Sequence, residues 1–295
     1  MSVLAQFVAN GIIAGSVYAL IALSFALIFT ATRVFHFAHG GVYTLAAFAA
    51  YTALAPLKLG ILAAFVTAAL VAGLVGYLIN ALLYEPMRAG GVSSFVMMIS
   101  SFGVLIILTH VVAIGWGSNP VVLSQGGLAT VYHLGTVYIT GAQLQIIGLA
   151  VALGVLLWVF FRYVSLGIAI RALGSDPELA EILGIPARRL RDISIVVGSV
   201  LVGLSAVMIG VNVGIIDFNM GSDIVLMATV AMIIGGLGNV GAAAGGGFVL
   251  GMIQNLAVWK IESKWQMAIS FAVLTLMLLF RPSGLFSEGR PAVGL

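Results

Sequence analysis

Long apolar stretches that carry almost no charge make up most of this chain, and most of them have the ~20 residues or more that a helix needs to cross a bilayer. Inside lipid every backbone N–H and C=O must be paired within the protein, so only helices and closed barrels can span a membrane. The stretches are much longer than the strands of a transmembrane barrel, which have about 10 residues. The sequence therefore predicts an all-α, polytopic helical bundle, with residues 1–295 forming one transmembrane domain.

The composition agrees with this fold class. Hydrophobic residues make up 62% of the chain and charged residues 7%, whereas a soluble domain has about 25% charged residues. Eight or nine spans are expected, because the seventh and eighth stretches are short and are joined by the sequence GGLGNVGAAAGGG. These two can form tilted spans, one broken helix or a re-entrant pair. The stretches are 4–31, 38–55, 60–83, 93–115, 143–161, 193–213, 223–237, 246–259 and 265–280.

The basic residues indicate how the chain is oriented. If residues 162–192 lie in the cytoplasm and the spans alternate, the arginines fall inside, the lysines fall outside and the N-terminus is outside, as the positive-inside rule expects. The inside set is Arg33, Arg88, Arg162, Arg171, Arg188, Arg189, Arg191, Arg281 and Arg290, and the outside set is Lys58, Lys260 and Lys264. These residues serve as topology signals, so no nucleic-acid partner is expected. Within the outer loop 116–142, the run VYH-LG-TVYIT predicts a small hairpin.

The charged loop 162–192 contains a short helix with clear start and stop signals. Asp176 is a good N-cap, Pro177 suits the first helical position, and Glu178 lies near the positive end of the helix dipole. Gly184 can adopt the left-handed conformation that ends a helix, and Ile185 offers the apolar contact that often accompanies it. The helix also has apolar residues, including Ala180 and Leu183. It can therefore dock on a partner protein or lie on the lipid surface.

Several kinds of chemistry have no signal in this chain. It has no cysteine, no Walker lysine motif, no HExxH sequence and no plausible Ser/His/Asp set. We therefore expect no enzymatic activity, no bound metal and no cofactor on this chain. A transporter driven by ion gradients should have charged residues in the middle of its spans, and none is evident.

Five segments carry a family resemblance that covers nearly the whole chain. The sequence GSVYALIALSFALIFTATRVFHFAHGGVYTLAAF, from Gly15 to Phe48, resembles the signature region of the permease subunits of branched-chain amino acid ABC importers. YEPMR at 84–88, RALGSDPELAEILGI, GGLGNVGAAAGG and RPSGLF extend the likeness. Asp176, Ala180, Gly184 and Ile185 resemble the coupling segment of such permeases.

The resemblance implies a multi-pass subunit of the bacterial inner membrane. Its partners would be a second permease subunit in a heterodimer, two cytoplasmic ATPases that bind ATP and Mg, and a solute-binding protein outside. Permeases of the same type that carry urea, amides or sugars are the main alternative, and an ion-coupled secondary transporter is a more distant one. One position departs from the pattern: the family usually has Asn-Phe-Ala-His-Gly where this chain has His36-Phe37-Ala38-His39-Gly40.

Two sets of residues are candidates for the transport route and its gate. An imidazole at position 36 can be cationic or donate a hydrogen bond where the family has a neutral amide, or it can simply start a helix. Polar residues within apolar spans can line a solute path, although hydrogen bonds between helices are their commoner role. Glycines such as Gly11 and Gly15 are expected to allow close packing of helices. In the segment 235–247 they can also allow gating. The path candidates are Tyr18, His36, His39, Gly40, Tyr43 and Asn212, and the gating candidates are Gly235, Gly236 and Gly238.

Overall fold

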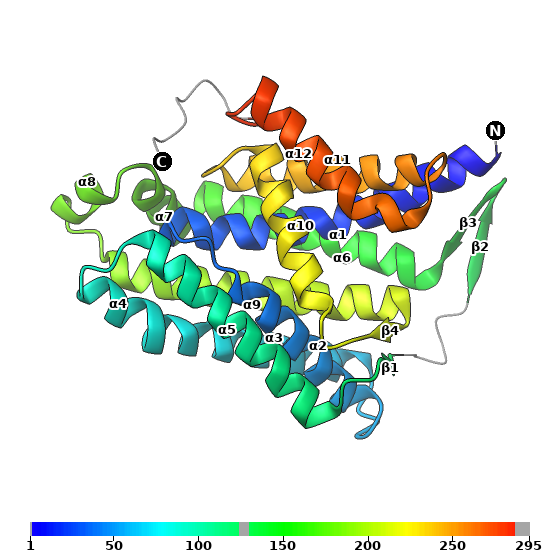
Figure 1. The fold of residues 1–295 in the computed structure, drawn as a ribbon, viewed down its shortest axis with the longest axis horizontal. Coiled ribbons are helices and arrows are strands. Elements are labelled where there is room, and N and C mark those ends of the chain that lie inside the picture. Colours follow the sequence, from blue (N-terminus) through cyan, green and yellow to red (C-terminus); the bar gives the residue numbers. More distant parts are fainter. Residues whose placement is uncertain (1, 124–129, 287–295) are drawn as a thin grey trace. The chain divides into compact units, whose positions relative to one another are not determined.

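The computed structural model describes residues 2–123 and 130–286 of the chain. Each of the nine predicted apolar stretches forms a helix, which confirms the all-α prediction (Figure 1). The helices of the first half are α1 (Ser2–Thr32), α2 (Ala38–Leu54), α3 (Ile61–Ile79), the π-helix η1 (Asn80–Tyr84), α4 (Glu85–Ala89) and α5 (Ser94–Trp116). Those of the second half are α6 (Gly141–Tyr163), α7 (Ser165–Ser175), α8 (Pro177–Ile182), α9 (Ala187–Val213), α10 (Met220–Gly235), α11 (Val240–Val258), the 3-10 helix η2 (Ser263–Trp265) and α12 (Gln266–Phe280).

Seven helices within the described residues are long and apolar enough to cross a membrane. The expected eight or nine spans are reached when α2, with 17 residues, and α10, with 16 residues, are added. Helix α2 begins only at Ala38, because residues 33–37, which connect it to α1, are not helical. The seven are Val3–Thr32, Ile61–Ala89, Ser94–Trp116, Gly141–Tyr163, Ala187–Val213, Val240–Val258 and Ser263–Phe280.

The chain packs into two compact units. Unit 1 comprises residues 1–26, 126–158 and 226–295, and unit 2 comprises residues 27–125 and 159–225. Three of the four boundaries fall within α1, α6 and α10, so these three helices each contribute to both units.

Helix α2 forms the core of unit 2. It contacts α3, α5 and α9, and most of its side chains are buried, including Tyr43 and Phe48. Small residues let α3 and α9 approach closely: a Cβ atom at Gly203 would press on Ala72, and one at Gly76 would overlap Ser199. Close packing through small residues is how membrane helices gain contact area when no water is available to drive them together.

In unit 1, the first half of α1 crosses α11 through glycines. A Cβ atom at Gly251 would overlap the backbone of Gly15, and one at Gly11 would press on Met252. The packing role predicted for Gly11 and Gly15 is confirmed. In the same unit, β2 (Val131–Leu134) and β3 (Val137–Thr140) form the predicted antiparallel hairpin, with Leu134 paired to Val137, so the turn lies one residue later than expected.

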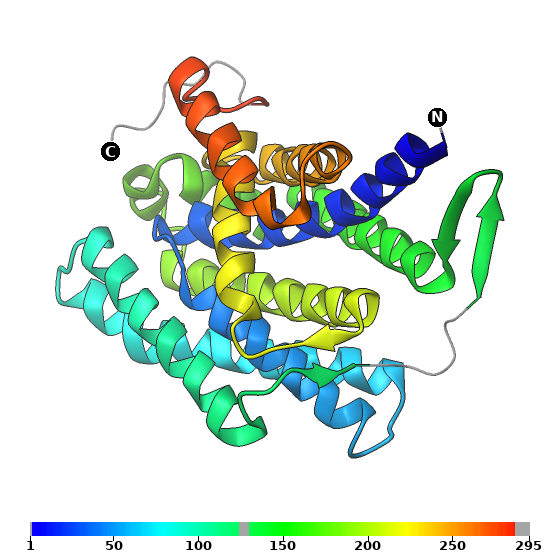
Figure 2. The same ribbon diagram turned by 45° about the vertical axis from the view of Figure 1, so that its right-hand side comes forward.

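A second strand pair was not predicted. In unit 2, β1 (Val121–Val122), just after α5, pairs in antiparallel fashion with β4 (Ile215–Ile216), just after α9 (Figure 2). Two-residue apolar strands give no alternation to detect, because a period of two needs several residues to be seen. The pair connects the ends of α5 and α9 at the end of unit 2 opposite α4 and α8 (Figure 1).

Three arginines of unit 2 that were assigned to the cytoplasmic side make polar contacts within the unit. Arg33 bonds to Gly174 of α7, Arg88 to Thr32 of α1 and Arg191 to Glu85 of α4. Their side of the membrane stays a prediction. Arg290, which was assigned to the same side, lies outside the described residues.

Cysteine labelling tests this topology. We expect Ser175→Cys to react with an impermeant thiol reagent only from the cytoplasmic side, and Thr136→Cys, in the hairpin turn, only from the outside. Both positions are exposed, and the natural chain has no cysteine to interfere. Ser124, another outer-loop position, lies outside the described residues. Labelling of both variants from one side would contradict the orientation.

Candidate functional site

Helix α8 begins with the cap that the sequence predicts. The Asp176 carboxylate Oδ1 accepts a hydrogen bond from the backbone N–H of Leu179 at 3.0 Å. Pro177 is the first helical residue, where its missing N–H costs nothing, and Glu178 lies in the first turn. The N-terminal end of α8 is therefore fixed by its own sequence.

The other end of α8 closes on Gly184. This glycine has a φ of 75°, and the N–H of Ile185 donates to the carbonyl of Ala180 at 3.0 Å. A bond across six residues with a left-handed glycine before its donor is the Schellman ending. The predicted left-handed conformation of Gly184 is confirmed, and Pro186 then begins the approach to α9.

The apolar side chains of α8 divide into two sets. Ala180 is buried, whereas Leu179, Ile182 and Leu183 are exposed to 50%, 75% and 69%. The short helix and the residue that follows it thus leave three large apolar side chains exposed. Sequence reasoning missed α7, the helix directly before α8, because it treated this part of the charged loop as a connection; α7 and α9 both contact α8.

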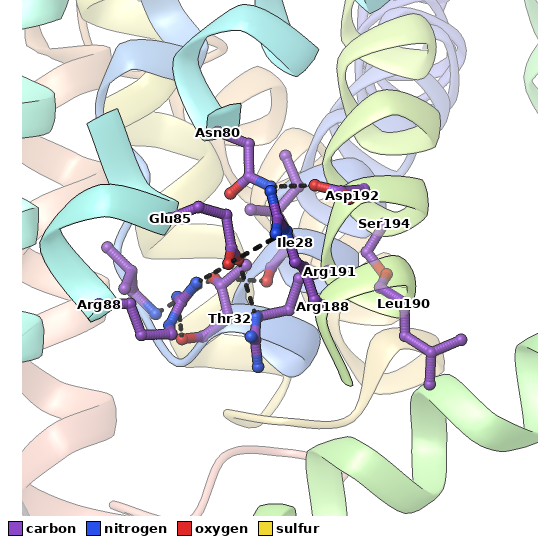
Figure 3. A network of polar contacts seen from close by, with 11 residues as sticks. Ile28, Thr32, Asn80, Glu85, Arg88, Arg188, Leu190, Arg191, Asp192 and Ser194 are labelled. Carbon is purple, nitrogen blue, oxygen red and sulfur yellow. Dashed lines mark hydrogen bonds and ion pairs between the residues drawn. The ribbon is translucent and has the colours of Figure 1, made fainter. Parts of the chain in front are cut away.

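An ion cluster lies where α4 meets the start of α9, and Figure 3 shows Glu85 facing three guanidinium groups. Glu85 contacts Arg88 at 2.9 Å, Arg191 at 3.1 Å and Arg188 at 3.8 Å. The Glu85 and Arg191 side chains are only 12% and 14% exposed, while Arg188 is 75% exposed. Two of these pairs are thus shielded from water and the third is a surface contact.

The ion cluster continues into the π-helix η1. Asn80, fully buried, donates from Nδ2 to Asp192 Oδ1 of α9 at 2.5 Å (Figure 3). Sequence reasoning did not single out Glu85, Asp192 or the cluster. The one available signal was the spacing of Glu85 and Arg88, which places opposite charges on the same face of a helix.

The histidine pair lies near the other end of the same π-helix. The Nδ1 atom of His36 is 2.6 Å from the Tyr84 hydroxyl, and the His36 and His39 ring centroids are 5.6 Å apart. Both histidines are buried. The residue at the N-cap position of α2 is Phe37, without a side-chain cap bond, so the His36 side chain contacts Tyr84 instead of capping the helix.

The other path candidates occupy different surroundings. Gly40, one residue after His39, packs directly on the backbone of Gly221. Tyr43 is buried in α2, and Asn212 is exposed near the end of α9. Tyr18 belongs to unit 1, where its carbonyl lies against Gly247. Their role in transport stays a prediction.

The gating candidates form the turn between α10 and α11 in unit 1. Gly236 and Gly238 have φ values of 134° and 82°, and Asn239 caps α11 by accepting from the N–H of Ala242 at 3.1 Å. The C-terminal RPSGLF segment pairs with this turn, because the N–H of Phe286 donates to the carbonyl of Gly235 at 3.1 Å. The turn is therefore held by backbone hydrogen bonds from a distant part of the sequence.

A family model described as branched-chain amino acid transport system, permease component, matches residues 7–278. The chain belongs to this permease family. Of the residues that the structure describes, no three His, Asp or Glu side chains are grouped so as to hold a metal ion.

Individual relatives match the permease over nearly its full length. It is 30% identical to the high-affinity branched-chain amino acid transport system permease protein LivH of Escherichia coli K12, over 96% of this chain and 95% of the relative. The corresponding protein BraD of Pseudomonas aeruginosa is 29% identical, over 98% and 96%. The family resemblance inferred from the sequence is confirmed.

A solved structure supports the fold. The structure described as PsaBC from Streptococcus pneumoniae in complex with Fab matches the permease with a TM-score of 0.54 and 14% identity, covering 94% of this chain and 93% of that chain. At this identity the likeness concerns the fold alone.

Proposed function

We propose that this permease is one transmembrane subunit of an ABC importer of the cytoplasmic membrane that carries branched-chain amino acids. It would pair with a second permease subunit, receive its cargo from a binding protein outside, and be driven by two cytoplasmic ATPases that bind ATP and Mg. The observation that carries the proposal is the family match over residues 7–278.

Helix α8 is the proposed contact with the ATPases. Its cap at Asp176 and its ending at Gly184 make it rigid, and its exposed Leu179, Ile182 and Leu183 offer an apolar face. An amphipathic helix with these properties fits a hydrophobic groove on a partner. A rigid helix also transmits force better than a flexible loop, because little of the displacement is lost in bending.

The path candidates and the glycine turn remain part of the proposal. Tyr18, His36, His39, Gly40, Tyr43 and Asn212 would line or border the route of the solute. Gly235, at the end of α10, and Gly236 and Gly238, whose positive φ values favour glycine, would allow a gate between α10 and α11.

Reconstitution tests both the cargo and the contact. We expect the permease with its partner subunits in liposomes to take up leucine when ATP and the loaded binding protein are supplied. Uptake of urea, an amide or a sugar in place of leucine would overturn the cargo, and uptake driven by an ion gradient without ATP would overturn the class of transporter.

In the same system, Gly184→Val should uncouple transport. A branched residue in the left-handed region costs about 1–2 kcal/mol, so the ending of α8 should open and its apolar face should lose its orientation. The stimulation of ATPase activity by the loaded binding protein should fall, while insertion in the membrane is kept. Gly148→Val is the control, since Gly148 of α6 faces open space. Unchanged stimulation in Gly184→Val would exclude α8 as the motor contact.

A further inference from the structure

Both flanks of α8 are tied to the same short piece of chain, the end of α1. On the α7 side, the Arg33 guanidinium donates to the carbonyl of Gly174. Gly174 also lies so close to Thr30 that a Cβ atom there would overlap it. Because Gly174 is two residues before the N-cap of α8, a displacement of α8 reaches Thr30 and Arg33 through packed atoms.

The α9 side reaches the end of α1 through the ion cluster. Arg191 of α9 bonds to Glu85 at 3.1 Å, and Glu85 bonds to Arg88 at 2.9 Å. Arg88 in turn donates from Nη2 to the Thr32 carbonyl at 3.4 Å, where a positive charge favours the negative end of the α1 dipole. The carboxylate of Glu85 is thus the central member of a chain of contacts from α9 to α1 (Figure 3).

The π-helix η1 supports this arrangement from the other side. Asn80 at its start bonds to Asp192 of α9 at 2.5 Å, and Tyr84 at its end bonds to His36, between α1 and α2, at 2.6 Å. A π-helix is rare and often marks a functional position. Here the widened turn lets a single element contact α9 and the segment between α1 and α2.

The segment between α1 and α2 is built to respond to such a displacement. Arg33 is one of two non-glycine residues with positive φ, at 58°, among those described. A non-glycine residue in this region is strained and persists only when its surroundings hold it. The contacts of Arg33 with Gly174 and of Arg88 with Thr32 supply that hold, so moving their partners would change the backbone there.

We propose that Glu85 and Arg33 are positioning residues that transmit the movement of α8 to the α1–α2 segment, residues 33–37. The proposal rests on the proposed function, in which an ATPase moves α8. It assigns the ion cluster a part in coupling, in addition to holding α4 against α9. The α1–α2 segment directly precedes His39 and Gly40, so a shift there would move the start of α2, the core helix of unit 2.

The test uses the assembled transporter in lipid nanodiscs with Glu85→Gln, which removes the charge and keeps the side-chain size. We expect the amount of assembled complex to stay the same, and the stimulation of ATPase activity by the loaded binding protein to fall by about tenfold, within the usual range of coupling between sites. Hydrogen exchange of the amides of residues 33–37 should change on addition of ATP and vanadate in the natural protein and remain unchanged in Glu85→Gln. A residue that only stabilises the fold would alter assembly without removing this ATP-dependent change.

Four further variants sharpen the test. Arg191→Gln should reproduce Glu85→Gln, and the double variant should be no worse than either, because both act through one contact. Arg189→Gln is the control, since it removes the same charge from an exposed neighbouring position. A short thiol cross-link between Asn80→Cys and Asp192→Cys in the Glu85→Gln background should restore coupling by holding α9 to η1. If Glu85→Gln does not assemble, Arg191→Gln decides by the same two measurements.

Two results would overturn the proposal: full stimulation with Glu85→Gln, or no ATP-dependent change of exchange at residues 33–37 in the natural transporter. The cargo is tested separately. A transporter that shows the exchange change and its loss in Glu85→Gln, but takes up no branched-chain amino acid, would contradict the proposed cargo and support the role of Glu85.

Discussion

Gly221→Leu is expected to abolish the correct packing of α10 on α2 and to leave little folded permease. Gly221 and Gly40 meet backbone to backbone, so a Cβ atom at Gly221 would overlap the Gly40 carbonyl. The N–H of Gly221 also donates to the hydroxyl of Thr44 at 3.1 Å, so the two helices cannot separate without breaking a buried hydrogen bond. Overpacking usually costs about 1–3 kcal/mol, and we expect at least the upper value because the obstructing atoms belong to a backbone that cannot rotate away.

The measurement is thermal stability of the purified permease in detergent, followed by size-exclusion chromatography with fluorescence detection. Gly103→Leu is the matched control, because Gly103 lies in the helix α5 with nothing within 4 Å of a Cβ atom. It should retain the elution profile and the melting temperature of the natural protein. A Gly221→Leu variant as stable as Gly103→Leu would show that α2 and α10 do not meet as the structure has them.

The close approach of Gly40 and Gly221 illustrates how much the sequence could predict. Hydropathy predicted both helices, because the need to pair backbone groups inside lipid leaves a strong local signal. The sequence also predicted both ends of α8, since Asp176 and Gly184 act on backbone groups only a few residues away. It could not predict that Gly40 meets Gly221, because a glycine shows that a close approach is allowed and does not name the partner.

The ion cluster was missed for a related reason. Glu85 and Arg191 are separated by 106 residues, and the pairing depends on how α4 and α9 pack. The positive-inside rule explained Arg88 and Arg191 as topology signals, so neither needed a partner. The side of the membrane stays a prediction, and the structure adds that Glu85 brings three of these arginines together.

The second large effect is expected at His36, where two substitutions should differ. His36→Leu removes the ring nitrogen that lies 2.6 Å from the Tyr84 hydroxyl. The loss of one such hydrogen bond costs about 0.5–1.5 kcal/mol. His36→Asn should cost much less, because an asparagine amide reaches about the same point as Nδ1 of histidine and can keep the bond to Tyr84. The other ring nitrogen, Nε2, has no hydrogen-bond partner among the described residues, so asparagine gives up little.

Melting temperatures of the two variants, with Tyr84→Phe and the double variant Tyr84→Phe/His36→Leu, test this contact. The effects of the two single changes should not add, because both remove the same hydrogen bond. Equal melting temperatures for His36→Leu and His36→Asn would mean that the bond to Tyr84 contributes nothing.

His36→Asn and His36→Leu together distinguish a structural role of His36 from a role in transport. His36→Asn restores the amide that the family usually has while keeping the contact with Tyr84, so any change in its cargo preference must come from the imidazole itself. If His36 borders the solute path, uptake by His36→Asn should differ from that of the natural protein in cargo preference. If His36 only holds Tyr84 and the α1–α2 segment, the two uptake curves should coincide and only His36→Leu should lose activity. Coinciding curves would remove His36 from the path and leave it as a support of η1, the element through which Glu85 contacts α9.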